Sequence, residues 1–94
     1  MRVSDHAVVR FAERHLRLGV RTMADLHGLR GDRDILAFLR KECGVDTEHW
    51  RNVLFGCACE MAGDAHEGVF WHGTLGIVVI EDVVVTVLHS RAAL

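Results

Sequence analysis

The stretch IVVIEDVVVTVL, residues 77–88, carries the strongest structural signal in this chain of 94 residues. It contains two runs rich in β-branched residues, and only Glu81 and Asp82 separate them. β-Branched residues favour strands, and a two-residue polar connection between two such runs predicts a tight β-hairpin. Residues 69–72, followed by a turn at Gly73, predict one more strand. We therefore expect an antiparallel β-meander of about three strands that ends in a hairpin.

The last predicted strand, residues 83–88, is apolar on both faces. Strict alternation would place Val83, Val85 and Val87 on one face and Val84, Thr86 and Leu88 on the other. An antiparallel sheet with one solvated face normally alternates apolar and polar residues, so both faces of this strand require cover. Helices can cover one face. For the other we expect a homodimer, formed through the sheet face or its edge strand.

About three helices are expected before the sheet. The first covers residues 6–18 after an N-cap at Ser4 or Asp5, the second covers residues 32–43, and the third covers residues 47–62. Each has apolar residues at the spacing of one helix face. Gly19 is expected to end the first helix, because glycine is common just after a helix C-terminus.

The expected fold is a single α+β domain over residues 1–94, with the helices on one face of the sheet. Residues 20–31 are expected to be mostly loop, with at most a helical turn. The aromatic residues fit core positions better than base-stacking positions, although Trp71 could be partly exposed. The expected core includes Val8, Phe11, Leu36, Leu39, Trp50, Leu54, Val79 and Val85.

Segment length and cysteine use indicate the compartment. No segment reaches the roughly 18 consecutive apolar residues of a membrane span, and residues 1–6 lack the apolar region of a signal peptide. We therefore expect a cytoplasmic protein that does not enter a membrane. An odd number of cysteines argues against a disulfide framework and favours free, mostly buried thiols at Cys43, Cys57 and Cys59.

Charge is distributed unevenly along the chain. The net charge is −2, but residues 1–21 hold five arginines and two acidic residues, whereas residues 52–94 hold one arginine and five acidic residues. The sequence therefore predicts a local basic surface near the N-terminus of an acidic protein. Protonation of all seven histidines would change the net charge from −2 to +5, so charge-dependent properties should respond to pH.

The first candidate site is the polar face of the first helix. At about 100° per residue, His6, Arg10, Arg14 and Arg17 fall on one face, with Glu13 beside them. Guanidinium groups hold phosphate oxygens in a fork, and an imidazole can transfer a proton near neutral pH. This pattern predicts a phosphodiester site. The alternative is an ordinary solvated face that Glu13 partly neutralises.

The second candidate site is the end of the hairpin, with Thr86, His89, Ser90 and Arg91. His89 and Arg91 would point to one face if the last strand continued, and they could complete a site together with the first helix. The alternative is a fraying C-terminal tail.

A third candidate, for a metal, is weaker. Its possible ligands are Cys57, Cys59, His66 and His72. On a helix the two thiols would point about 200° apart, and the Cys-x-x-Cys spacing of structural zinc sites is absent. We therefore expect no metal site and no cofactor.

Residues 3–14, VSDHAVVRFAER, resemble the opening of small phage- and plasmid-borne proteins with an N-terminal H-A-x-x-R-x-x-E-R helix. Some of those proteins belong to, or resemble, the toxin nucleases of the barnase–colicin–RelE-like fold, whose last strand often reads like residues 83–88. The resemblance covers the two ends of the chain. It implies an N-terminal helical part and a closing antiparallel sheet. It also implies that the functional residues of the helix are His6, Arg10, Glu13 and Arg14.

Two function classes follow from these patterns. The first is a toxin-like, metal-independent endoribonuclease or RNA-binding domain. Its catalytic residues would be His6, Arg10, Arg14 and His89, and its RNA-binding residues Arg10, Arg14, Arg17 and Arg91. RNA cleavage of this type uses the 2′-hydroxyl of the substrate as the nucleophile, so the protein needs none.

The second class is a non-enzymatic phage or mobile-element protein that binds and regulates or inhibits a host protein complex. Acidic side chains could mimic phosphate towards a basic partner, and the candidates are Glu60, Asp64, Glu67, Glu81 and Asp82. The sequence leaves both classes open.

Overall fold

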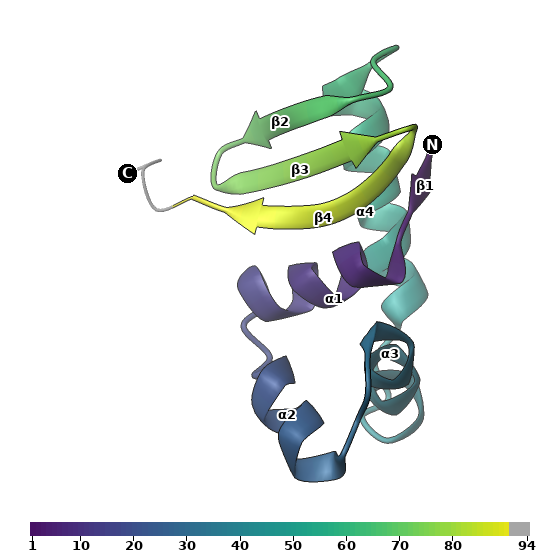
Figure 1. The fold of residues 1–94 in the computed structure, drawn as a ribbon, viewed down its shortest axis with the longest axis vertical. Coiled ribbons are helices and arrows are strands. Elements are labelled where there is room, and N and C mark those ends of the chain that lie inside the picture. Colours follow the sequence, from purple (N-terminus) through teal and green to yellow (C-terminus); the bar gives the residue numbers. More distant parts are fainter. Residues whose placement is uncertain (91–94) are drawn as a thin grey trace.

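The computed structural model describes residues 1–90, which form four helices and one four-stranded sheet (Figure 1). The elements are β1 (Arg2–Val3), α1 (Asp5–Arg14), α2 (Val20–His27), α3 (Asp32–Lys41), α4 (Thr47–Ala62), β2 (Gly68–His72), β3 (Leu75–Ile80) and β4 (Val83–His89). The expected α+β class is confirmed, with one helix and one strand more than expected. None of the helices described has the length and apolar character needed to cross a bilayer.

The sheet has the strand order β1-β4-β3-β2 and is mixed. β2, β3 and β4 form the expected antiparallel meander, whereas β1 pairs parallel to β4, with Arg2 opposite Val83. The expectation of a purely antiparallel sheet was therefore wrong. A two-residue strand is too short to show a period in the sequence, and its partner lies at the other end of the chain.

The hairpin turns at Glu81 and Asp82, as expected, and both residues are left-handed, with φ of 49° and 62°. Two left-handed residues match the twist of the flanking strands in a two-residue turn. The N-terminal ammonium of Met1 donates to Asp82 Oδ2 at 2.8 Å, so the start of the chain is fixed to this turn. This bond is the main reason why the pKa of Asp82 lies below its ordinary value.

A β-bulge in β4 changes which residues face the core. Val78 pairs with Thr86, but Val79 pairs with Val84, so Val85 has no partner of its own on β3. An extra residue shifts the alternation of a strand by one position. Val84 and Val87 are consequently both fully buried, although strict alternation placed them on opposite faces.

Two helices differ from their predicted bounds. α1 ends at Arg14 rather than near Leu18, because Arg17 and Gly19 adopt left-handed backbone angles, with φ of 54° and 60°. Gly19 is the N-cap of α2 and not the end of α1. The expected loop after it is an eight-residue helix, in which Val20 is buried. Short helices of this kind depend on tertiary packing, which the local pattern does not reveal.

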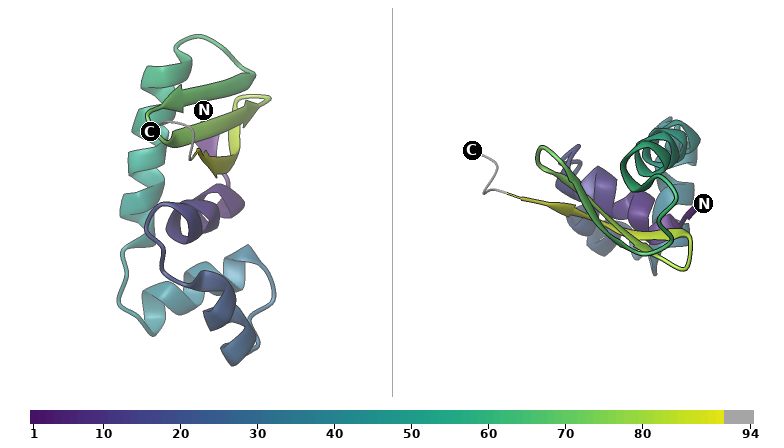
Figure 2. Two further views of the ribbon diagram at one scale, coloured as in Figure 1. Left: turned by 90° about the vertical axis from the view of Figure 1, so that its left-hand side faces the viewer. Right: turned by 90° about the horizontal axis from the view of Figure 1, so that it is seen from above.

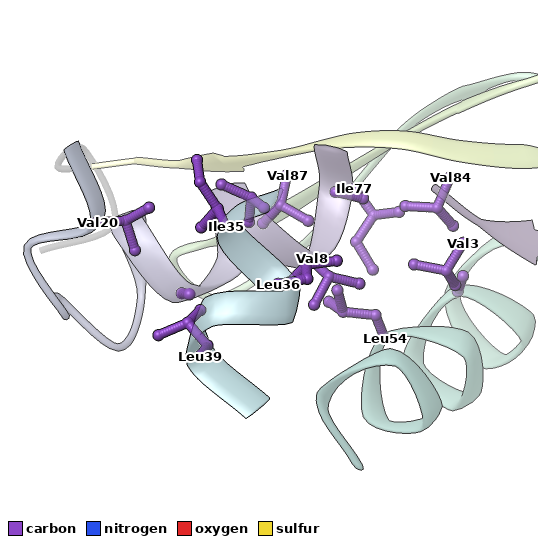
Figure 3. Close-up of a cluster of buried hydrophobic side chains, with 14 of the residues drawn as sticks. Val3, Val8, Val20, Ile35, Leu36, Leu39, Leu54, Ile77, Val84 and Val87 are labelled. Atoms are coloured by element: carbon purple, nitrogen blue, oxygen red, sulfur yellow. The ribbon is translucent and has the colours of Figure 1, made fainter. Parts of the chain in front are cut away.

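α1 and α4 supply most of the contacts between helices and sheet. α1 lies along β4, α4 contacts β1 and β2, and α2 and α3 lie beyond α1 (Figure 1). The buried side chains of these elements form one continuous cluster (Figure 3). Five of the expected core residues are buried, namely Val8, Leu36, Leu39, Leu54 and Val79.

Phe11, Trp50 and Val85 are half-buried, so their assignment to the core was too strong. Phe11 and Trp50 pack against the edge of the buried cluster. Val85 is the extra residue of the bulge.

The opposite face of the sheet carries no helix in the described part of the chain (Figure 2). Val69, Trp71 and Ile80 are each about half exposed on β2 and β3. We name these three residues the outer apolar face. Leu88 of β4 pairs with Gly76, and Gly76 pairs with Trp71, so the second face of β4, for which the sequence required cover, lies on the same side of the sheet.

Candidate functional site

α1 seals the edge of β4 that β1 leaves unpaired. Ser4 Oγ donates to the Val85 carbonyl at 3.1 Å, and Arg14 Nη1 donates to the Val87 carbonyl at 2.8 Å. His15 Nε2 lies 3.0 Å from the Leu88 carbonyl and donates to it. Side chains of the helix thus satisfy backbone groups of the strand edge, which fixes Arg14 and His15 beside the end of β4.

The N-terminal half of the polar stripe on α1 is internally paired. His6 Nδ1 lies 3.0 Å from Asp32 Oδ2, and Arg10 Nε donates to His6 Nε2 at 3.3 Å. With Nε2 accepting, the ring proton lies on Nδ1 and is donated to Asp32. Arg10 Nη1 also contacts both carboxylate oxygens of Glu13, at 3.1 and 3.2 Å. His6 and Arg10 therefore connect α1 to α3 and are already engaged by carboxylates.

The C-terminal half of the stripe has no such compensation. Neither Arg14 nor Arg17 forms an ion pair with a carboxylate among residues 1–90. Arg14 donates to a neutral backbone carbonyl, and Arg17 is exposed. Arg17 also has a left-handed backbone, which is uncommon for a residue with a long side chain. Arg17 lies three residues after the last residue of α1, Arg14.

Both arginines line a cleft of about 840 Å³ at the end of the sheet. Its lining consists of Glu13, Arg14, Arg17, Trp71, Leu88, His89 and Ser90. The C-terminal ends of α1, β2 and β4 lie on the same side of the molecule and supply these residues (Figure 1). We name this cavity the basic cleft.

The basic cleft unites part of the two sequence-predicted sites. Arg14 and Arg17 from the helix stripe meet His89 from the hairpin end. His6 and Arg10 do not line the cleft, so the predicted catalytic group is divided between the N-terminal half of α1 and the basic cleft. Arg91 lies outside the described residues.

Neighbouring rings hold His89. Its imidazole lies 4.9 Å from that of His15, which in turn stacks on Phe11 at 5.7 Å between ring centroids. The helical period places the polar His15 on the apolar side of the predicted first helix. Its position is explained by these two rings and by the Leu88 carbonyl.

Sequence reasoning missed Trp71 as a site residue. The tryptophan was expected to fit a core position better than a base-stacking one, with partial exposure allowed, but it is 49% exposed and lines the basic cleft. Strand alternation carried the necessary signal, because Phe70 and Trp71 must point to opposite faces of the sheet. Glu13, which the resemblance named as functional, is also in the lining.

The cysteines are free, but they are not mostly buried. Cys43 and Cys59 are exposed and Cys57 is half-buried, which corrects the expectation. Helix α4 turns Cys57 and Cys59 to different sides. Among residues 1–90 there is no group of three or more histidine, cysteine, aspartate or glutamate side chains that could hold a metal ion.

Comparison with protein-family models, curated proteins and solved structures finds no match to this chain. The resemblance to toxin nucleases therefore stays a prediction. The basic cleft is the feature of the structure that bears on function.

Proposed function

We propose that the protein binds single-stranded RNA in the basic cleft. The observation that carries this proposal is the pair of guanidinium groups, Arg14 and Arg17, that have no carboxylate partner among residues 1–90 and line one cavity. Arg10 and Arg51, by contrast, are paired with acidic side chains. An arginine without a carboxylate partner can donate to a phosphate in a forked, charge-assisted contact without first losing an ion pair.

The overall charge is consistent with a local site rather than a broad coat for nucleic acid. A net charge of −2 provides little long-range attraction to RNA, so binding should depend on the few cations of the cleft. Affinity for RNA should then fall with salt concentration by the slope of one or two phosphate contacts.

The same cleft also holds groups that could cleave RNA. Glu13 and His89 both line it, so a carboxylate and an imidazole accompany the two arginines. Glu13 could accept the proton of the 2′-hydroxyl as its oxygen attacks phosphorus. His89 could donate a proton to the departing 5′-oxygen, which leaves a 2′,3′-cyclic phosphate and a 5′-hydroxyl. In this scheme His6 and Arg10 support Glu13 and touch no substrate.

Fluorescence anisotropy with a short labelled single-stranded RNA tests the binding proposal. Arg14→Ala and Arg17→Ala should each weaken binding by about tenfold, the effect of one lost charge-assisted contact. Arg40→Ala is the matched control, because Arg40 is an exposed cation of α3 outside the basic cleft and its loss should leave affinity within about twofold. Equal losses in all three variants would contradict a specific cleft.

Incubation of total RNA with the protein in EDTA tests cleavage separately. Fragments ending in cyclic phosphate, lost in Glu13→Gln and His89→Gln, would support it. Intact RNA at high protein concentration, with binding retained, would show that the cleft binds and does not cut.

A second candidate function is binding of a protein partner, and the outer apolar face favours it. Val69, Trp71 and Ile80 each expose about half of their surface on the same face of the sheet. Single exposed apolar residues are common, but a group of them on one face is typical of an interaction site. Recovery of a defined protein in a pull-down, lost in Val69→Thr with Ile80→Thr, would favour this class. Recovery of RNA, lost in Arg17→Ala, would favour the first. Light scattering after size exclusion tests the expected homodimer.

A further inference from the structure

Two adjacent aromatic residues of β2 have different surroundings. Phe70 packs against the buried cluster, whereas Trp71 is 49% exposed and lines the basic cleft. The register of β2 with β3 fixes this difference, because successive residues of a strand point to opposite faces. Trp71 therefore presents a large aromatic surface to whatever enters the cleft.

A glycine determines where the Trp71 ring lies. Trp71 pairs with Gly76 on β3, and Gly76 pairs with Leu88 on β4. The six-membered part of the indole lies against Gly76, where an added Cβ would come within 2.7 Å of both Cζ3 and Cη2. Glycine weakens the interior of a strand and often marks the close approach of another group. Here that group is the indole, which occupies the space that a Cβ at position 76 would need.

Uncompensated positive charge lies beside this ring. Arg14 and Arg17 line the same cleft as Trp71, and neither is paired with a carboxylate among residues 1–90. A flat aromatic surface next to cations matches the two parts of a nucleotide, a planar base and an anionic phosphate. An aliphatic partner would need only the apolar part of this surface, and a free anion would need only the arginines.

We infer that Trp71 is a stacking platform for an unpaired nucleobase whose neighbouring phosphate is bound by Arg14 and Arg17. This inference rests on the proposed RNA binding and narrows its substrate class. Bases in a duplex are stacked on one another and cannot reach an aromatic side chain, so the ligand is single-stranded at the bound position. Stacking depends little on base identity, so the platform should select for strandedness and not for sequence.

Adenosine 5′-monophosphate and ribose 5-phosphate test the inference, because they share sugar and phosphate and only the first carries a base. Isothermal titration calorimetry measures both affinities in every variant, and a Trp50→Phe protein, in which Trp71 is the remaining tryptophan of the chain, reports the quenching of its indole emission. We expect the nucleotide to bind about tenfold more tightly than ribose 5-phosphate and to quench this emission, because one stacked base contributes about this factor or more.

Three variants separate stacking from a merely structural role of the ring. Trp71→Ala should remove the preference for the nucleotide and leave the affinity for ribose 5-phosphate unchanged. Trp71→Phe should restore part of the preference. Gly76→Ala should displace the ring and weaken nucleotide binding, but it should have no further effect on binding in the Trp71→Ala background. Circular dichroism and thermal unfolding show which variants are folded.

The outcomes distinguish this inference from the proposed function. Equal affinity for both compounds, lost in Arg17→Ala, would overturn the stacking platform and leave the phosphate site standing. A nucleotide preference that survives Trp71→Ala would also overturn the platform. Absence of binding for both compounds and for single-stranded RNA would overturn the inference together with the proposed function.

Discussion

The two ends of α1 carry similar side chains but differ in how these side chains are paired. At its N-terminal end, His6 bonds to Asp32, and Arg10 bonds to both His6 and Glu13. At its C-terminal end, Arg14 and Arg17 face the basic cleft without a carboxylate partner among residues 1–90. One stripe in the sequence thus becomes a structural connection at one end and a candidate binding surface at the other.

The two ends of the sheet also differ in how their charged groups are paired. On the side where β1 pairs with β4, the ammonium of Met1 bonds to Asp82, and Arg51 bonds to the Val3 carbonyl and to Asp5. We name this side the closed end and the side of the basic cleft the open end. Arginines by themselves therefore do not mark a nucleic-acid site. What distinguishes the open end is a cleft in which two arginines without a carboxylate partner among residues 1–90 lie together with an exposed indole.

The largest expected effect is on the stability of the closed end. Arg51→Ala removes three contacts, which leaves the Val3 carbonyl, Asp5 and Glu48 without this donor. We expect the free energy of unfolding to fall by about 1–3 kcal/mol, the usual cost of losing hydrogen bonds to a charged donor. Urea denaturation measures this change. RNA affinity should stay within experimental error, and a loss of affinity in a folded Arg51→Ala protein would break the distinction between the two ends.

The next effect is on binding at the open end. Ser90→Glu places a carboxylate in the lining of the basic cleft and gives Arg14 and Arg17 the kind of partner that Arg10 already has. We expect RNA affinity to fall by about tenfold, because a fixed anion competes with phosphate for the same donors. Ser90→Gln is the uncharged control. An equal loss of RNA affinity in Ser90→Gln would show that the effect comes from the size of the side chain and not from its charge.

A smaller effect concerns Arg17, where one substitution should change stability and RNA binding in opposite directions. Arg17 is left-handed, with φ of 54°, and a non-glycine residue in this region costs about 1 kcal/mol. Arg17→Gly should therefore raise the free energy of unfolding by up to about 1 kcal/mol while it weakens RNA binding. Glu81→Gly is the matched control, because Glu81 is also left-handed, with φ of 49°, but lies at the closed end. It should stabilise the fold and leave binding unchanged.

The smallest expected effect concerns acid stability at the closed end. The Met1 ammonium lowers the pKa of Asp82 in the folded state, so this carboxylate stabilises the fold above its unfolded pKa. That contribution is lost as the pH falls through the lowered value. Relative to wild type, Asp82→Asn should be less stable at neutral pH, and the difference should shrink below about pH 4. Denaturation of both proteins at several pH values measures it, and a constant difference would contradict the ion pair.

The sequence predicted the parts of the fold that depend on local patterns. The hairpin followed from β-branched runs around Glu81 and Asp82, and Ser4, one of the two predicted N-cap residues, caps α1. The parallel pairing of Arg2 with Val83 could not be predicted, because nothing local connects two residues so distant in the chain. The bulge at Val85 was equally hidden, because a valine there carries none of the glycine or proline signals that mark irregular strands.

The candidate site was predictable only in part. Helical spacing grouped Arg14 with Arg17, and the predicted end of the hairpin contributed His89. The basic cleft brings these three residues together. Spacing alone could not show that Asp32, on another helix, would engage His6. Trp71 was missed because an aromatic residue in an apolar strand is usually buried, and its exposure depends on the absence of a second layer in the described chain.

The pairing of β1 with β4 has a consequence for how the chain folds. Arg2 and Val83 join residues from opposite ends of the described structure, and the long edge of α1 rests on the same last strand. Contacts between such distant segments form late, because a large loop must close before they contribute any stability. During synthesis, α1 therefore has no strand to seal until β4 has left the ribosome. Until then the apolar side of α1 lacks its cover from the sheet, and exposed apolar surface of this kind is prone to aggregation.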